Sequence, residues 1–253
     1  MLDLAQGPLL VAVADSPDTL ARAAESDPLT RPFDLIEARL DLYPAQSIDG
    51  CETACARLES SGTPVLITLR TANQGGRWVA GDAERLPRFR AALAVASWAD
   101  VEEDAGILAG VAALVRARPG GQLVVSHHDF SETPPLDALV ARVDAGHRAA
   151  PGAVAKIATR VRSDDDRRTL RALIERRRDR TAVIGMGDGD DGLRVALAAA
   201  GSLLAYGALG TPTAPGQLAA EVVHLRLLAA SPRYAARRGQ MGRPQGAAGP
   251  GPT

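Results

Sequence analysis

Lysine is almost absent from this sequence. Lys156 is the only lysine among the 29 lysine and arginine residues of the 253-residue chain, although lysine is normally one of the commonest residues. The bias indicates that arginine stands wherever a cation alone is needed. Arginine cannot replace a reacting amine, because a guanidinium stays protonated whereas an ammonium can lose its proton and attack a carbonyl. We therefore predict that Lys156 is a nucleophile that forms a Schiff base.

The residues next to Lys156 favour the same role. Val154, Ala155, Ile157 and Ala158 make an apolar, strand-like run, and burial in such a run disfavours the charged form of an amine. The alternative is a surface lysine that drift has not removed, but solvated lysines rarely lie inside an apolar strand.

Other scarce features exclude broad classes of function. Aromatic residues make up 3% of the chain and 29 basic residues are balanced by 30 acidic ones, which argues against nucleic acid as a partner. No apolar run approaches 18 residues and the N-terminus has no basic leader, which argues against membrane insertion and secretion. Cys51 and Cys55, four apart on one predicted helix, are typical of core residues in a reducing cytosol and not of a metal site. We expect a cytoplasmic protein that acts on a small polar metabolite.

Short apolar runs rich in β-branched residues alternate with segments of helical periodicity. The predicted strands are 9–14, 33–41, 64–70, 99–103, 122–130, 153–159, 181–187 and 203–209. The predicted helices lie near 17–26, 51–61, 82–97, 105–117, 134–148, 163–178, 191–200 and 215–230. Eight strand–helix pairs predict a (β/α)8 TIM barrel, because a doubly wound sheet usually has fewer strands and an early glycine-rich turn. We expect one catalytic domain at 1–234 and a disordered Gly/Pro/Arg-rich tail at 235–253.

Two predicted helices carry start signals. The segment near 163–178 begins with Ser163 and three aspartates and ends in three arginines. Both charge runs match the helix dipole, so they are predicted to be helix-end residues. Thr133 is predicted to cap the helix near 134–148.

Charged residues end the second predicted strand. Glu37, Arg39 and Asp41 alternate, so they would share one face, where unpaired charges are costly. Either a functional site or a structural ion-pair cluster at the barrel rim would explain them. The C-terminal strand ends carry the chemistry in such barrels, which favours the site.

Polar residues also end the third and fifth predicted strands. Thr68 and Arg70 precede a glycine pair at 75–76, which is a weak signal by itself. His127 and His128 are adjacent, and because side chains alternate along a strand only one can point into the barrel mouth.

The turn at 185–189, after the seventh predicted strand, is rich in glycine. Such turns often bind phosphate through backbone N–H groups, but the aspartates within 188–191 would repel a phosphate. We therefore expect Arg194 to bind a carboxylate. The loop at 211–217 is long enough to be a lid.

Six short motifs occur in order along these strands and loops. They are Glu-x-Arg-x-Asp at 37–41, Thr-x-Arg at 68–70 with Gly-Gly at 75–76, Ser-x-His-Asp-Phe at 126–130, Lys-Ile-Ala at 156–158, Met-Gly at 186–187 with Arg194, and Ala-Pro-Gly-Gln at 214–217. Together they resemble the type I 3-dehydroquinate dehydratases over about residues 9–230.

The resemblance implies the third step of the shikimate pathway, which leads to the aromatic amino acids. In this step a hydro-lyase converts 3-dehydroquinate to 3-dehydroshikimate and water through an imine on a lysine, without metal or cofactor. The resemblance also implies a homodimer.

Residue roles follow from the matching motifs. Lys156 would be the Schiff-base lysine and His128 the general acid/base, which leaves His127 as a neighbour. Six positions would bind the substrate: Glu37, Arg39, Arg70, Arg194, Thr213 and Gln217. Of these, Arg194 would hold the substrate carboxylate, and Thr213 and Gln217 would close over it from the lid.

The chain departs from the family pattern beside the catalytic histidine. Gln74 stands where glutamate usually precedes the Gly-Gly pair; it can orient an imidazole by a hydrogen bond but cannot stabilise an imidazolium by charge. Leu193 replaces the serine usual before the carboxylate-binding arginine, and Thr213 stands where serine is common.

Two other functions stay open. One is another Schiff-base barrel, such as a class I aldolase, which would need a phosphate site that the aspartates within 188–191 argue against. The other is a barrel that binds a shikimate-like acid without turnover; Gln74 favours it and the retained Lys156 opposes it.

Overall fold

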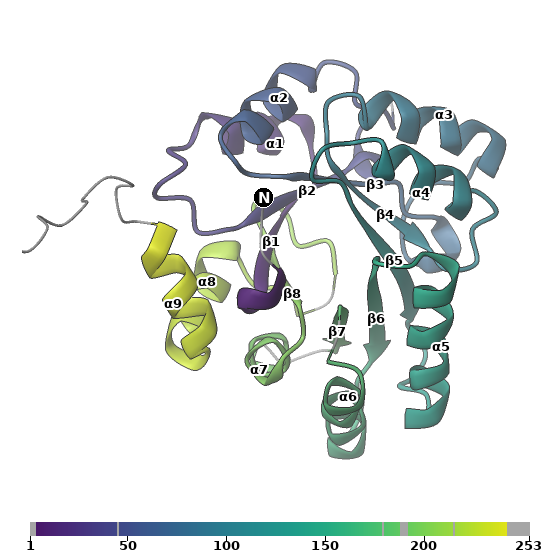
Figure 1. The fold of residues 1–253 in the computed structure, drawn as a ribbon, viewed down its shortest axis with the longest axis vertical. Coiled ribbons are helices and arrows are strands. Elements are labelled where there is room, and N and C mark those ends of the chain that lie inside the picture. Colours follow the sequence, from purple (N-terminus) through teal and green to yellow (C-terminus); the bar gives the residue numbers. More distant parts are fainter. Residues whose placement is uncertain (1–3, 45, 179, 188–191, 215, 242–253) are drawn as a thin grey trace, which may run out of the picture.

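The computed structural model describes residues 4–44, 46–178, 180–187, 192–214 and 216–241. These residues form eight parallel strands alternating with helices, which is the predicted (β/α)8 barrel (Figure 1). The strands are β1 (Leu9–Ala14), β2 (Leu35–Arg39), β3 (Val65–Thr68), β4 (Trp98–Glu102), β5 (Gln122–Asp129), β6 (Val154–Arg160), β7 (Thr181–Met186) and β8 (Leu204–Ala208). Each lies within two residues of its predicted limits or inside them.

Each strand is followed by a helix. The helices are α1 (Pro17–Glu25), α2 (Glu52–Ser60), α3 (Asp82–Ala92), α4 (Leu108–Arg116), α5 (Leu136–Ala149), α6 (Asp164–Arg176), α7 (Leu193–Ala200), α8 (Ala220–Ala230) and α9 (Pro232–Met241). Short 3-10 helices occur at η1 (Leu4–Gln6), η2 (Leu40–Leu42) and η3 (Ala72–Gln74). In the parts of the chain that the structure describes, no helix has the length and apolarity needed to cross a membrane.

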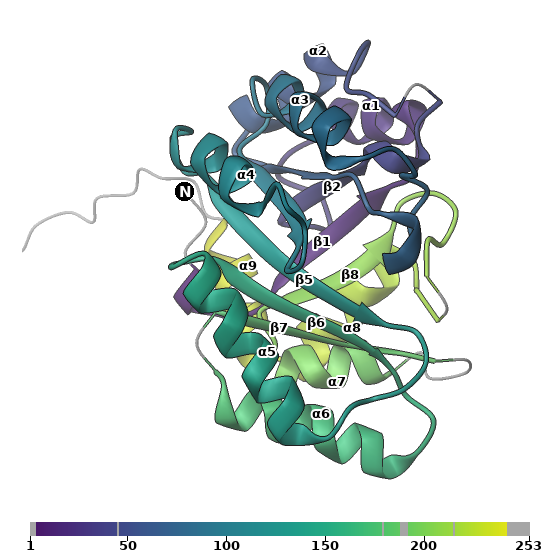
Figure 2. The ribbon, with the colours of Figure 1, turned by 90° about the vertical axis from the view of Figure 1, so that its right-hand side faces the viewer.

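The strands close almost completely into a barrel. Parallel ladders join them in the order β7-β6-β5-β4-β3-β2-β1-β8, and Val13 of β1 is paired with both Glu37 and Ala208. β7 and β8 are neighbours, and the N–H of Leu203 donates to the carbonyl of Thr181 at 2.9 Å between them. Figures 1 and 2 show the helices packed round the outside of the strands.

Side chains inside the barrel change from apolar to polar along the strand direction. The buried apolar cluster near the N-terminal strand ends includes Leu9, Leu35, Leu66, Trp98 and Val154. Two residues further along four of these strands, the buried side chains are Glu37, Thr68, Asp100 and Lys156. Because alternate residues of a strand share a face, these polar groups also lie inside the barrel. The C-terminal end of the barrel is therefore where charge gathers.

The outer face of the strands packs against the helices. Ile36 and Ile67 belong to a buried cluster with Leu20 of α1 and Leu58 of α2. Cys55 of α2 is fully buried in this cluster, and both cysteines are free thiols, as the sequence indicated.

The predicted domain boundary at residue 234 is wrong, because helix α9 continues to Met241. Tyr234 is fully buried, and Arg237 donates to both carboxylate oxygens of Asp34 at 2.6 and 2.7 Å and to the carbonyl of Pro8 at 2.8 Å. Alanine and arginine are good helix formers, and α9 is rich in both. The prediction failed because this segment was judged together with the Gly- and Pro-rich residues that follow it. The rest of the predicted tail, 242–253, lies outside the described residues.

Two local predictions also need correction, and one is confirmed. Asp41 lies in η2 and not on a strand with Glu37 and Arg39. The N-cap of α5 is Pro135 without a side-chain cap, because the Thr133 hydroxyl bonds Thr159 and the carbonyl of Arg160 instead. Ser163 does cap α6, in a reciprocal capping box with Asp166.

Candidate active site

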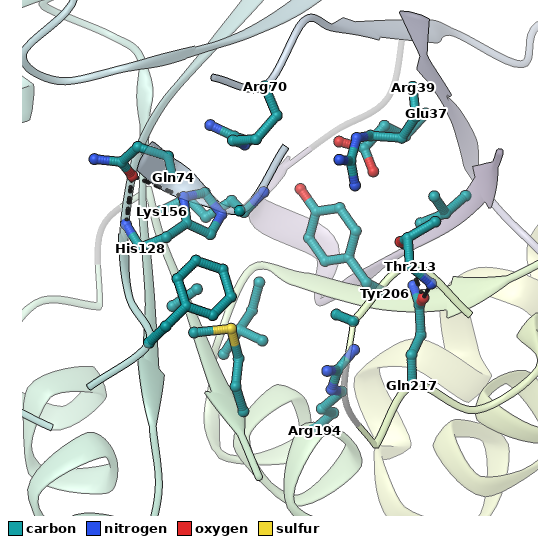
Figure 3. Close-up of a pocket in the computed structure, with 17 residues that line it drawn as sticks. Glu37, Arg39, Arg70, Gln74, His128, Lys156, Arg194, Tyr206, Thr213 and Gln217 are labelled. Atoms are coloured by element: carbon teal, nitrogen blue, oxygen red, sulfur yellow. Dashed lines mark hydrogen bonds between the residues drawn. The ribbon is translucent and has the colours of Figure 1, made fainter. Parts of the chain in front are cut away.

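A cavity opens at the C-terminal ends of the strands (Figure 3). All nine residues that the sequence singled out line it: Glu37, Arg39, Arg70, Gln74, His128, Lys156, Arg194, Thr213 and Gln217. Other lining residues are mostly apolar and include Phe130, Ile184, Met186 and Tyr206. Residues from six strands and from the 211–217 loop thus meet at one place.

Lys156 lies at the centre of β6 with its amine inside the barrel. Its side chain is 6% exposed, and Nζ is 2.9 Å from Oδ2 of Asp100. Nζ also lies 4.6 Å from the centre of the Tyr206 ring, a position in which the ring face attracts a cation. The amine is therefore buried, as predicted, but it has a counter-ion that the sequence had not indicated.

Asp100 of β4 connects the amine to the rest of the site. It is fully buried and also accepts hydrogen bonds from Arg70 at 2.8 Å and from the Ser126 hydroxyl at 2.6 Å. Burial by itself would raise the pKa of Asp100, but Arg70 and then Lys156 outweigh burial and hold that pKa well below its usual range. Asp100 is therefore an anion at any working pH.

Arg70 is fixed by this network and is not a mobile cation. Besides Asp100 it contacts Ser126 at 2.7 Å and Glu102 at 3.2 Å. Glu102 in turn pairs with the buried Arg85 of α3. These contacts anchor the guanidinium at the cavity wall.

His128 points into the cavity, whereas His127 points away from it. His127 Nδ1 lies 3.1 Å from Glu103 on the outer side, where Glu103 also pairs with Arg142. The opposite directions follow from strand alternation.

Gln74 fixes the tautomer of His128. Its Oε1 accepts a hydrogen bond from the backbone N–H of His128 at 2.9 Å and lies 3.2 Å from Nδ1 (Figure 3). Because the backbone N–H requires the amide oxygen on that side, Nδ1 must carry a proton and donate to it. Nε2 then keeps its lone pair and can act as a base. Burial, followed by the charges of Arg70 and Lys156, lowers the pKa of His128 well below 6.5, so the neutral form is present at pH 7.

The glycine pair after Gln74 allows this arrangement. Gly75 has a φ of 80° and packs under the Phe130 ring, a conformation that other residues rarely adopt. A Cβ on Gly76 would lie 2.0 Å from the Arg70 carbonyl oxygen. The chain can therefore turn tightly enough to place Gln74 against His128.

Glu37 and Arg39 form the opposite wall. The Thr68 hydroxyl donates to Glu37 at 2.6 Å, and Arg39 makes a two-pronged ion pair with Asp41, both contacts at 2.9 Å. Both side chains are nearly buried. Arg39 and Asp41 therefore form an ion pair, as one explanation of the Glu-x-Arg-x-Asp segment expected. Glu37 and Arg39 also line the cavity, so a role in binding stays a prediction.

Arg194, Thr213 and Gln217 lie together at the remaining side. Burial lowers the pKa of Arg194 to about 10, so a ligand carboxylate would stabilise its charged form. Oε1 of Gln217 accepts from the Thr213 N–H at 2.8 Å and from its hydroxyl at 3.1 Å, which leaves the NH2 end of the amide as a donor. The aspartates within 188–191, on which the argument against phosphate depended, lie outside the described residues.

Two residues of the site were not singled out from the sequence: Asp100 and Tyr206. Ser126 was named only as part of the motif at 126–130, without a role. Asp100 and Tyr206 are polar residues in mostly apolar strands, at positions that point into the barrel. A polar residue at an inward position of the alternating pattern could have identified both. No cluster of three or more His, Cys, Asp or Glu side chains suited to a metal ion occurs among the residues described.

The model of the type I 3-dehydroquinase family matches residues 11–229. The chain belongs to this family.

Relatives and solved structures agree with the assignment. A 3-dehydroquinate dehydratase from Pyrobaculum aerophilum is 35% identical over 205 residues, which are 79% of this chain and 65% of that protein. The structure of a 3-dehydroquinate dehydratase from Geobacillus kaustophilus matches with a TM-score of 0.72 and 26% identity over 87% of this chain and 90% of its own. That from Aquifex aeolicus matches with a TM-score of 0.73 and 24% identity, covering 87% and 98%, and supports the fold.

Proposed function

We propose that this type I 3-dehydroquinase removes water from 3-dehydroquinate to give 3-dehydroshikimate through an imine on Lys156. The observation that carries the proposal is a buried amine facing a cavity that also holds a neutral histidine base and a buried arginine. An amine, a base and an anion-binding group are what this dehydration needs. The family and the names of the relatives support the substrate.

Substrate binding would begin at the two ends of the molecule. The carboxylate at C1 would pair with Arg194 and accept from the amide NH2 of Gln217, while the carbonyl at C3 would face Lys156. Glu37, Arg39 and Arg70 would bind the hydroxyl groups on the rest of the ring.

Covalent catalysis would then proceed in four steps: formation of the iminium, removal of the C2 proton, loss of the C1 hydroxyl as water, and hydrolysis of the imine. A proton would first pass from Lys156 Nζ to the neutral His128. The free amine then attacks C3, His128 returns the proton to the C3 hydroxyl that forms, and loss of water gives an iminium whose positive charge faces Asp100. The iminium acidifies the C2 proton, which His128 removes through Nε2 to give an enamine. The enamine expels the C1 hydroxyl, His128 returns the proton so that water leaves, and hydrolysis of the imine releases the product and the amine.

A direct assay tests the proposal. Conversion of 3-dehydroquinate creates a double bond conjugated with both the carbonyl and the carboxylate, so product formation is followed by ultraviolet absorbance. Turnover by the wild type is expected, and none by Lys156→Arg, because a guanidinium keeps the charge but cannot form the imine. Turnover well above background in a folded Lys156→Arg protein would contradict the covalent mechanism. Binding without turnover by the wild type would favour a barrel that only binds the acid.

We further propose that the enzyme is a cytoplasmic homodimer in the pathway to the aromatic amino acids. The resemblance to the family supports the dimer, and α8 offers an exposed apolar stripe of Val222, Leu225 and Leu228. Free Cys51 and Cys55 are compatible with a reducing compartment. Sedimentation velocity tests the dimer: a monomer at micromolar concentration would contradict it.

A further inference from the structure

The hydroxyl of Tyr206 is buried in the active-site cavity without a hydrogen-bond partner. Tyr206 lies at the middle of β8, is 5% exposed and lines the cavity. Among the residues that the structure describes, no group bonds its hydroxyl. A buried polar group left unpaired destabilises a fold. Because the Tyr206 hydroxyl lies at a cavity, a bound ligand could supply the missing hydrogen-bond partner.

The environment of this hydroxyl defines the kind of group it would bind. Burial, followed by the charges of Glu37 and Asp100, raises the pKa of Tyr206 well above 10, so the hydroxyl is a neutral O–H donor at any working pH. Figure 3 shows the hydroxyl directed toward the side of the cavity where Glu37 and Arg70 lie. No direct bond joins Tyr206 to Glu37 in this part of the structure. A single ligand group bound by both would accept from the Tyr206 hydroxyl and donate to the Glu37 carboxylate.

An alcohol does both, since a hydroxyl group has one donor and two acceptor positions. A carbonyl or an ether would accept from Tyr206 but could not donate to a carboxylate. The Tyr206 ring also touches the Lys156 amine. The bound alcohol should therefore be on a carbon close to the one that Lys156 attacks.

We propose that the Tyr206 hydroxyl binds the C4 hydroxyl of 3-dehydroquinate, on the carbon next to the reacting carbonyl, and that this same hydroxyl donates to Glu37. The inference rests on the proposed function. This contact would make Tyr206 a specificity-determining residue that selects an α-hydroxy ketone. The tyrosine hydroxyl would then have a hydrogen-bond partner only when substrate is bound.

Tyr206→Phe tests the inference, because it removes the hydroxyl and keeps the ring beside Lys156. We expect KM for 3-dehydroquinate to rise about 3- to 10-fold, the range for losing one hydrogen bond, with kcat changed less than twofold. The melting temperature without substrate should be unchanged or higher, because the removed group had no partner.

Tyr43→Phe is the matched control. The Tyr43 hydroxyl is also buried without a partner in the described chain, but Tyr43 does not line the cavity. Its replacement should have the same effect on melting temperature and none on KM. In a double-mutant cycle, Tyr206→Phe and Glu37→Gln should be non-additive in kcat/KM, since both act on one substrate hydroxyl.

Three results would overturn the inference while leaving the proposed function intact. They are a KM within twofold of an active wild type, a loss confined to kcat, and full additivity with Glu37→Gln. A wild type without turnover would instead remove the proposed function, and the inference with it.

Discussion

At the scale of single residues, Asp100 is the group that holds the Lys156 amine. Its carboxylate contacts Lys156, Arg70 and Ser126 at once. In the proposed mechanism an iminium would carry its positive charge close to the present position of Lys156 Nζ, so Asp100 would stabilise that intermediate as well as hold the lysine.

Asp100→Asn should therefore lower kcat/KM by at least about 10-fold, because the amide keeps the shape and removes the charge. Asp104→Asn, an exposed aspartate shortly after β4, is the control and should leave kcat/KM within twofold. Steady-state kinetics on both variants checks this; equal values for the two would show that Asp100 is only structural.

The two adjacent histidines should behave differently. His128→Ala should lower kcat by roughly 10²- to 10⁴-fold, the usual contribution of a general acid/base. His127→Ala should lose much less, since that ring lies against Glu103 outside the cavity. Equal losses, or the reverse order, would mean that the wrong ring has been assigned to the base.

Gln74→Glu should move the pH profile. A carboxylate next to Nδ1 favours the imidazolium and raises the pKa of His128, which in the wild type lies well below 6.5. The base must be neutral to act, so the acidic limb of kcat/KM, which reports the free enzyme, should shift to higher pH. The rate above that limb should rise if base strength limits turnover. An unchanged limb in a folded, active variant would show that this contact does not tune the histidine.

Sequence reasoning found the residues that stand in motifs and missed two that stand alone. Lys156 could be identified because lysine is scarce in this chain. His128 and Arg194 could be identified because they stand in motifs of the family that the sequence resembles. Asp100 and Tyr206 matter because they contact Lys156 across the barrel. The spacing of residues along one strand does not predict contacts between strands that are not neighbours.

At the scale of elements, the end of the chain departs most from the sequence reading. All eight strands were predictable because apolar runs and helical periodicity alternate clearly. Helix α9 was not predictable in this way, because its buried face is held by the ion pair between Arg237 and Asp34, which lies more than 200 residues earlier in the chain. Asp34 also accepts from the backbone N–H of Leu10 at 2.7 Å, so α9 is joined to the start of the barrel.

Arg237→Ala should lower the free energy of unfolding by about 3 kcal/mol, the lower end of the range for breaking a buried ion pair, because Arg238 still contacts Asp34. Arg171→Ala in α6 removes an ion pair with Glu175 in which both side chains are mostly exposed, and should change that free energy by less than about 1 kcal/mol. Urea unfolding compares them. Equal stability of the two variants would mean that α9 does not help to hold the barrel.

At the scale of the whole molecule, barrel closure assembles the site. Glu37 of β2 and Lys156 of β6 come from strands that are not neighbours in the sheet, and they line one cavity because the sheet curves round on itself. His128 lies on β5, the strand paired with β6. The alternation of strand and helix segments along the chain predicted the barrel. The barrel in turn predicted that residues at the C-terminal strand ends would lie close together. The distances that make chemistry possible, such as 2.9 Å between Lys156 and Asp100, required the structure.

Borohydride trapping tests the central claim most directly. The chain has one lysine, so a reduced imine on an ε-amine can form only at Lys156. Treating the enzyme with 3-dehydroquinate and sodium borohydride should give one stable adduct by intact mass, mapped by peptide analysis to Lys156, and should abolish activity. Lys156→Arg treated in the same way should gain no mass. An active wild-type enzyme that forms no adduct, or forms it on another residue, would contradict the account.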